Sequence, residues 1–149
     1  MHRRAAGFSL IELLVVLVLL ALASAAVALS VPPSDPLREP VQRLAARLAH
    51  ARELAVLRNQ SLRALLDSDG YRFEQRQQGQ WQPSPDRALA AQPWPAPTAL
   101  VFAGQATEQL QLTLDPAGNT LPGLLELHSG QQHWQLQLHA DGSIDVQRR

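Results

Sequence analysis

One acidic residue interrupts the most apolar stretch of the chain. Glu12 is the only charge between Ala5 and Val31, and it follows Gly7 by five positions. A charge at the centre of a membrane helix costs roughly 2.5–3.5 kcal/mol on insertion scales, and less near the headgroups. An ionisable group in such a segment indicates a function and a partner, whereas a tolerated charge near the headgroups is the structural alternative.

The apolar stretch itself has the length of a membrane span. Between Leu13 and Val31 its only polar members are Ser24 and Ser30. As an α-helix it would extend about 28 Å, close to the roughly 30 Å of a hydrocarbon core. Two arginines precede it and no basic residue follows until Arg38, so the N-terminus is expected in the cytoplasm and the remainder outside. A removable secretory signal, cleaved near Ala23, is the alternative, but such a signal gains nothing from Glu12.

The ten residues from Gly7 to Val16 carry a resemblance. Their sequence, GFSLIELLVV, resembles the N-terminal signal of type IV pilins and type II secretion pseudopilins, in which glycine, an aromatic residue and glutamate open an apolar helix. The resemblance implies that a prepilin peptidase cuts between Gly7 and Phe8 and methylates the new amino terminus of Phe8. Residues 1–7 would then be the leader, and residues 8–31 a retained transmembrane helix and filament stem.

Elementary chemistry agrees with that processing. Glycine has no side chain, so a protease can approach the backbone before the scissile bond closely. Cleavage would leave a cationic amine on Phe8, about one helical turn from Glu12. In a filament of packed helices, the carboxylate of one subunit could neutralise the amine of its neighbour, since either charge left unpaired there would be costly. Glu12 is therefore interpreted as an assembly and register residue.

Composition narrows the function classes. The chain has 13 Arg, no Lys and 13 acidic residues, and beyond residue 31 there are 11 Arg and 12 acids. A neutral domain has no basic field that would attract nucleic acid, so a nucleic-acid partner is disfavoured. No cysteine is present, which excludes disulfides, thiolate zinc sites and a cysteine nucleophile.

A proline-rich stretch, Ser30–Pro40, is expected to end or kink the membrane helix. Asp35 is a suitable N-cap for a second helix, with Pro36 at its first position. Apolar residues then recur at spacings of three and four to about Asn59, which predicts an amphipathic helix within residues 32–60 that lies on a sheet. These residues are Val41, Leu44, Ala45, Leu48, Ala51 and Ala55.

Residues 61–149 show the alternation of antiparallel strands. A hairpin is expected around Ser68-Asp69-Gly70, and further strands at 110–115, 133–140 and 143–146, the last after an Asp141-Gly142 turn. Five prolines between 83 and 97 predict an exposed loop. The expected fold class is α+β, with a helical stem packed on antiparallel β-sheets in the manner of a pilin.

Looser similarity covers most of the chain. The segments LAARLAHARELAVLRNQ, LTLDPAGNT and DGSIDV are similar to the H-type minor pseudopilin of type II secretion systems. This resemblance implies an inner-membrane protein with a periplasmic domain, placed near the tip of a pseudopilus that helps drive protein export. Its partners would be the prepilin peptidase, the major pseudopilin, other minor pseudopilins and membrane lipid. The alternatives are a minor type IV pilin, including a DNA-uptake receptor, and a tethered binding domain whose motif match is accidental.

Other residues that could do chemistry have simpler interpretations. A calcium loop needs a third ligand before its glycine and a glutamate beyond it at fixed spacing. Asp67-Ser68-Asp69-Gly70 does not supply both, so a hairpin turn is favoured. His133 and His139 have the parity opposite to Trp134 and are expected to face solvent. We predict no metal site, no cofactor and no enzyme activity, because neither ligand spacings nor a catalytic constellation are found.

Overall fold

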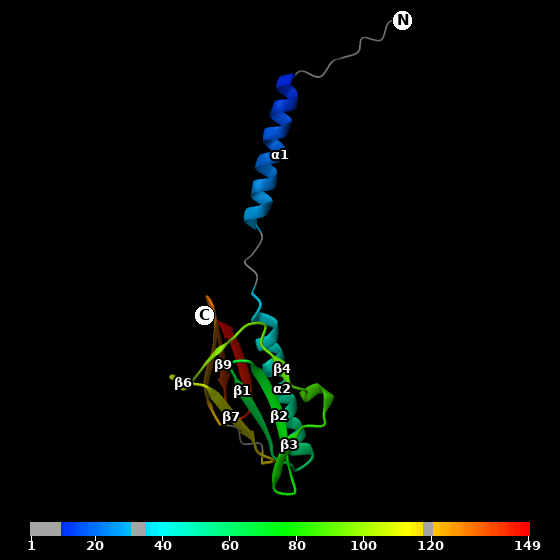
Figure 1. The fold of residues 1–149 in the computed structure, drawn as a ribbon, viewed down its shortest axis with the longest axis vertical. Coiled ribbons are helices and arrows are strands. Elements are labelled where there is room, and N and C mark those ends of the chain that lie inside the picture. Colours follow the sequence, from blue (N-terminus) through cyan, green and yellow to red (C-terminus); the bar gives the residue numbers. More distant parts are fainter. Residues whose placement is uncertain (1–9, 31–34, 118–120) are drawn as a thin grey trace, which may run out of the picture. The chain divides into compact units, whose positions relative to one another are not determined.

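The computed structural model describes residues 10–30, 35–117 and 121–149. The chain divides into two units, residues 1–34 and residues 35–149. The first contains helix α1 (Leu10–Ser30), and the second, called the head below, contains helix α2 (Arg38–Leu57) and two antiparallel sheets (Figure 1). The predicted α+β class is confirmed.

Helix α2 begins two residues later than predicted. Leu37 occupies the N-cap, and Pro36 lies in the preceding turn. The carboxylate of Asp35 nevertheless accepts a hydrogen bond from the Arg38 N–H at 3.1 Å, while its carbonyl accepts from the same group at 3.3 Å. Pro40 is the third residue of the helix, where the missing N–H costs no intrahelical bond. The predicted break falls partly on residues 31–34, outside the described residues.

The amphipathic face of α2 is confirmed. It consists of Val41, Leu44, Leu48, Ala51 and Ala55, all buried. Their spacing of three and four residues places them on one side of the helix, and this side packs on both sheets. The small residues at the C-terminal end of this stripe let the helix approach the sheets closely.

The first sheet, sheet A, has the strand order β3-β2-β1-β7, with β4 pairing the start of β2. The hairpin predicted around Ser68-Asp69-Gly70 is confirmed, since Leu66 pairs with Tyr71 across an antiparallel ladder. The strands are β1 (Leu62–Asp67), β2 (Gly70–Gln77), β3 (Gln80–Pro83), β4 (Gln92–Pro93) and β7 (Gln109–Leu114).

The second sheet, sheet B, has the order β10-β9-β8-β5-β6. The two predicted C-terminal strands form its β9–β10 hairpin, which turns at Asp141-Gly142. The sequence did not predict β5, β6 or β8. The strands are β5 (Ala99–Phe102), β6 (Gln105–Thr107), β8 (Gly123–Ser129), β9 (Gln132–Leu138) and β10 (Ile144–Arg148).

One hydrophobic core joins α2 to the inner faces of both sheets. Alternate residues of each strand point inward, as in β7, where Leu110, Leu112 and Leu114 are buried between exposed neighbours. Leu125, Leu127 and Leu136 supply the opposite face from β8 and β9. The head is thus a two-sheet domain whose core the second helix completes.

The prediction of an exposed loop over 83–97 is wrong for part of that segment. Leu89, in the short 3-10 helix η1 (Arg87–Leu89), is 1% exposed and Trp94 is 6% exposed. The Trp94 backbone N–H donates to Asp69 O at 2.8 Å and its indole Nε1 donates to Asp67 O at 2.9 Å. Its ring packs 5.1 Å from Tyr71. The prolines break regular structure, but the segment is tied to the β1–β2 turn and closes one side of the core.

Candidate functional site

Helix α1 is the apolar candidate site. Its window Leu10–Val27 has a mean hydropathy of 2.8 and is long and apolar enough to cross a membrane. None of that window is buried, and large side chains such as Leu10 and Ile11 are 83% and 70% exposed. The only hydroxyl in this window, that of Ser24, donates to Leu20 O at 2.8 Å, which suits an apolar environment because no water is needed to satisfy it. Such a surface requires lipid or other helices around it.

Glu12 lies in the first described turn of α1 and is exposed. An acidic group at a helix N-terminus interacts favourably with the helix dipole. Within residues 10–30, helix α1 contains no Arg, Lys or His that could pair with Glu12. Gly7 and Phe8, the predicted cleavage and methylation residues, lie outside the described residues.

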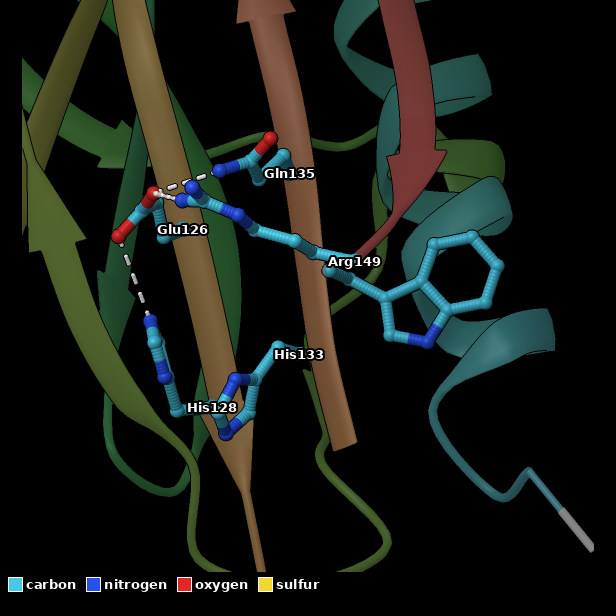
Figure 2. Close-up of a pocket in the computed structure, with 6 residues that line it drawn as sticks. Glu126, His128, His133, Gln135 and Arg149 are labelled. Carbon is cyan, nitrogen blue, oxygen red and sulfur yellow. Dashed lines mark hydrogen bonds and ion pairs between the residues drawn. The ribbon is translucent and has the colours of Figure 1, made fainter. Parts of the chain in front are cut away.

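A small hollow of about 190 Å³ lies on the outer face of sheet B (Figure 2). Its carboxylate, Glu126, takes three contacts: Gln135 Nε2 donates to Oε1 at 2.7 Å, Arg149 Nη1 lies 3.8 Å from Oε1, and His128 Nε2 lies 3.5 Å from Oε2. The His128 ring also packs against His133, with centroids 4.4 Å apart.

These contacts determine the chemistry of the hollow. The hydrogen bond from Gln135, aided by His128 and Arg149, lowers the pKa of Glu126 below its ordinary value. A carboxylate stabilised in this way is a poor general base near neutral pH. The residues that line the hollow include two histidines, a glutamate, a glutamine and an arginine, and no serine, threonine or cysteine.

The turn at Asp67–Gly70 and the two histidines of the C-terminal hairpin have the structural roles expected from the sequence. Asp67 Oδ1 accepts from the N–H groups of Asp69 and Gly70, which confirms the predicted turn. His133 is exposed and His139 partly so, as predicted from their parity. In the part of the chain that the structure describes, no three His, Asp or Glu residues are arranged to hold a metal ion.

The tryptophans are all engaged in the head. Trp94 and Trp134 are each 6% exposed in the core, and Arg63 stacks over the Trp81 ring at 4.4 Å from its centroid. Trp94 and Trp134 thus serve as core packing, while Trp81 is partly exposed on a strand of sheet A.

Sequence reasoning missed one polar cluster. Asp35 at the start of the head contacts Trp134 and Arg148. These partners are about a hundred residues away in the sequence, and no local pattern joins them. Asp35 was assigned to helix capping alone.

Comparison with known proteins identifies the family. A family model described as type II transport protein GspH matches residues 41–142. The chain belongs to this family. A second model, the prokaryotic N-terminal methylation motif, matches residues 2–28 and covers Gly7, Phe8 and Glu12. The predicted resemblance to the H-type proteins of type II secretion is thereby confirmed.

A solved structure shows the same fold. The minor pseudopilin EpsH from the type 2 secretion system of Vibrio cholerae matches with a TM-score of 0.61 and 19% identity, over 76% of this chain and 98% of that one. At this identity the likeness establishes the fold. A search of curated proteins returned no match.

Proposed function

We propose that this GspH family member is a minor pseudopilin, a structural subunit of the type II secretion apparatus. The observation that carries the proposal is the presence on one chain of an N-terminal methylation motif over residues 2–28 and a GspH domain over residues 41–142. The exposed apolar helix α1, most of which lies within the matched motif, supplies the anchor and stem that such a subunit needs. A type IV pilin that takes up DNA is not favoured, because the family is that of type II transport and the chain has no net charge.

The proposed processing follows from the motif. A prepilin peptidase removes residues 1–7 and methylates Phe8, and residues 8–31 hold the protein in the inner membrane with its N-terminus cytoplasmic. Residues 32–60 and 61–149 form the periplasmic helix and β domain, which contact neighbouring pseudopilins near the tip of the filament. Intact-mass measurement and N-terminal sequencing of the membrane-extracted protein test this. A chain that starts at N-methylated Phe8 is expected, and a start near Ala26 would indicate an ordinary signal peptide and overturn the proposal.

Glu12 is proposed to set the register of assembly. Its carboxylate neutralises the Phe8 amine of an adjacent subunit, because both charges would otherwise be unpaired in a low-dielectric filament core. We expect Glu12→Gln to be cleaved normally but to be recovered poorly with the major pseudopilin in sheared filament fractions. Glu12→Asp retains the charge and serves as the matched control. Equal recovery of Glu12→Gln and the native protein would rule out this role.

A further inference from the structure

The first residue of the head holds three separate parts of the domain together. Asp35 Oδ1 accepts a hydrogen bond from the Arg38 N–H at 3.1 Å and another from Trp134 Nε1 at 3.2 Å. Asp35 Oδ2 lies 3.4 Å from Nη1 of Arg148. One carboxylate thus connects the first turn of α2 to β9 and to the last residue of β10.

The burial of this carboxylate makes its contacts strong. The Asp35 side chain is only 9% exposed, and Trp134 is 6% exposed. Within the described residues Oδ2 is buried and accepts no hydrogen bond, so the ion pair with Arg148 is the compensation for its charge. Hydrogen bonds to an ionised acceptor are about twice as strong as neutral ones, and removal of one partner leaves a buried charge uncompensated.

A second tie lies two residues further along. The Leu37 N–H donates to Oε1 of Gln132, the first residue of β9, at 3.3 Å, and the Leu37 side chain is fully buried. N–H groups at a helix start have no intrahelical acceptor and must be satisfied elsewhere. Here two of them are satisfied by side chains, those of Asp35 and Gln132. The latter belongs to sheet B.

We propose that the Asp35 cluster, consisting of Asp35, Leu37, Gln132, Trp134 and Arg148, is a mechanical latch that stops tension in the stem from peeling α2 off the sheets. This inference rests on the proposed function, in which the head is joined to a filament through the stem. A helix pulled from its end detaches turn by turn, and each turn alone is held by few contacts. The latch connects the first turn of α2 to strands β9 and β10. A pulling force applied at residue 34 therefore acts on sheet B before the helix starts to unwind.

A latch slows unfolding under force only when the force pulls on the stem end of α2. A contact that only stabilises the head slows unfolding for every pulling direction. The chain contains no cysteine, so two introduced cysteines give unique attachment points for single-molecule force measurements on the mature chain in detergent. Ser34→Cys with Gln80→Cys pulls on α2 through its N-terminal end. Gln80→Cys with Glu108→Cys, at two exposed positions on strand ends and turns, pulls on the same head away from the latch.

When the chain is pulled through the cysteines introduced at positions 34 and 80, the first geometry, helix α2 of Asp35→Ala is expected to detach roughly 100-fold faster at a given force. This factor corresponds to the loss of two charge-assisted hydrogen bonds. Asp35→Asn keeps an oxygen acceptor but loses the charge opposite Arg148, so its rate should be intermediate. Arg148→Gln changes a half-exposed side chain outside the core and should resemble Asp35→Asn. Asp145→Asn, which removes an exposed carboxylate of β10, is the matched control and should have no effect in either geometry.

The second geometry decides the question. A latch predicts that the Asp35 and Arg148 variants unfold there within about threefold of the native rate. Equal acceleration in both geometries would mean that the cluster only stabilises the head, and no acceleration in the first would mean that it bears no load. Either result overturns the proposal. Failure of the proposed function is detected separately, by the mass of the processed N-terminus.

Discussion

The proline-rich segment 83–97 provides the most direct test of how the head is built. Trp94 anchors it: the indole is 6% exposed, donates to Asp67 O and packs against Tyr71. Truncation of a buried Trp to Ala typically costs about 3–5 kcal/mol, from lost transfer free energy and the cavity that remains. Because a domain of this size has a total stability of about 5–15 kcal/mol, Trp94→Ala should remove a large share of the free energy of unfolding.

The matched control is Trp81→Ala. Trp81 lies on the outer face of sheet A, partly exposed, with Arg63 stacked over its ring. Loss of an exposed cation–π contact costs only about 0.5–1 kcal/mol. Trp94→Ala is therefore expected to lower the free energy of unfolding severalfold more than Trp81→Ala.

The stability of both variants is measured by urea unfolding of the mature protein in detergent. Circular dichroism is used to follow unfolding, so that loss of an indole does not affect the signal. With a urea dependence of about 2 kcal/mol per molar, Trp94→Ala should lower the midpoint by roughly 2 M and Trp81→Ala by less than about 0.5 M. Trp94→Phe, which keeps most of the packing but loses the bond to Asp67 O, should fall between them. Equal midpoints for Trp94→Ala and Trp81→Ala would refute the conclusion that this segment is part of the core.

Two further predictions concern a carboxylate and a turn. The hydrogen bond from the Ala88 N–H, aided by His50 and Arg58, holds the pKa of Asp86 below its ordinary value. The Asp86 carboxylate therefore stabilises the fold at a pH above its ordinary pKa. This stabilisation is lost as the pH falls through the lower pKa of the folded state. Asp86→Asn should therefore lower the urea midpoint at pH 7 but match the native protein in acid, and a difference that persisted in acid would contradict the assignment. Gly142 has a φ of 82° with Arg52 packed over it, so Gly142→Ala should cost about 1–3 kcal/mol from backbone strain plus displacement of the arginine. Gly79→Ala, at a similar φ of 81° in open space, gives the backbone cost alone, and an equal loss in calorimetry for both variants would show that Arg52 moves freely.

Local patterns in the sequence determined much of this protein. The membrane-length helix, the buried face of α2 and both predicted hairpins follow from spacings within a few residues, because helix and strand periodicity and turn chemistry are local properties. The N-terminal motif is also contiguous, and it pointed to the family before any tertiary contact was known. Glu12 stood out for the same reason, since a single charge in an apolar run needs no neighbour to be recognised.

The tertiary structure alone decided which segments meet. β7 pairs with β1, and β5 pairs with β8, across long stretches of sequence that no period connects. Trp94 is buried because the β1–β2 turn offers it backbone acceptors, although the prolines around it are typical of an exposed loop. Asp35 looked like a helix cap, yet its burial and its ion pair come from strands about a hundred residues away. Contacts of this kind depend on the free energy of the whole packed core, which a pattern of neighbouring residues does not contain.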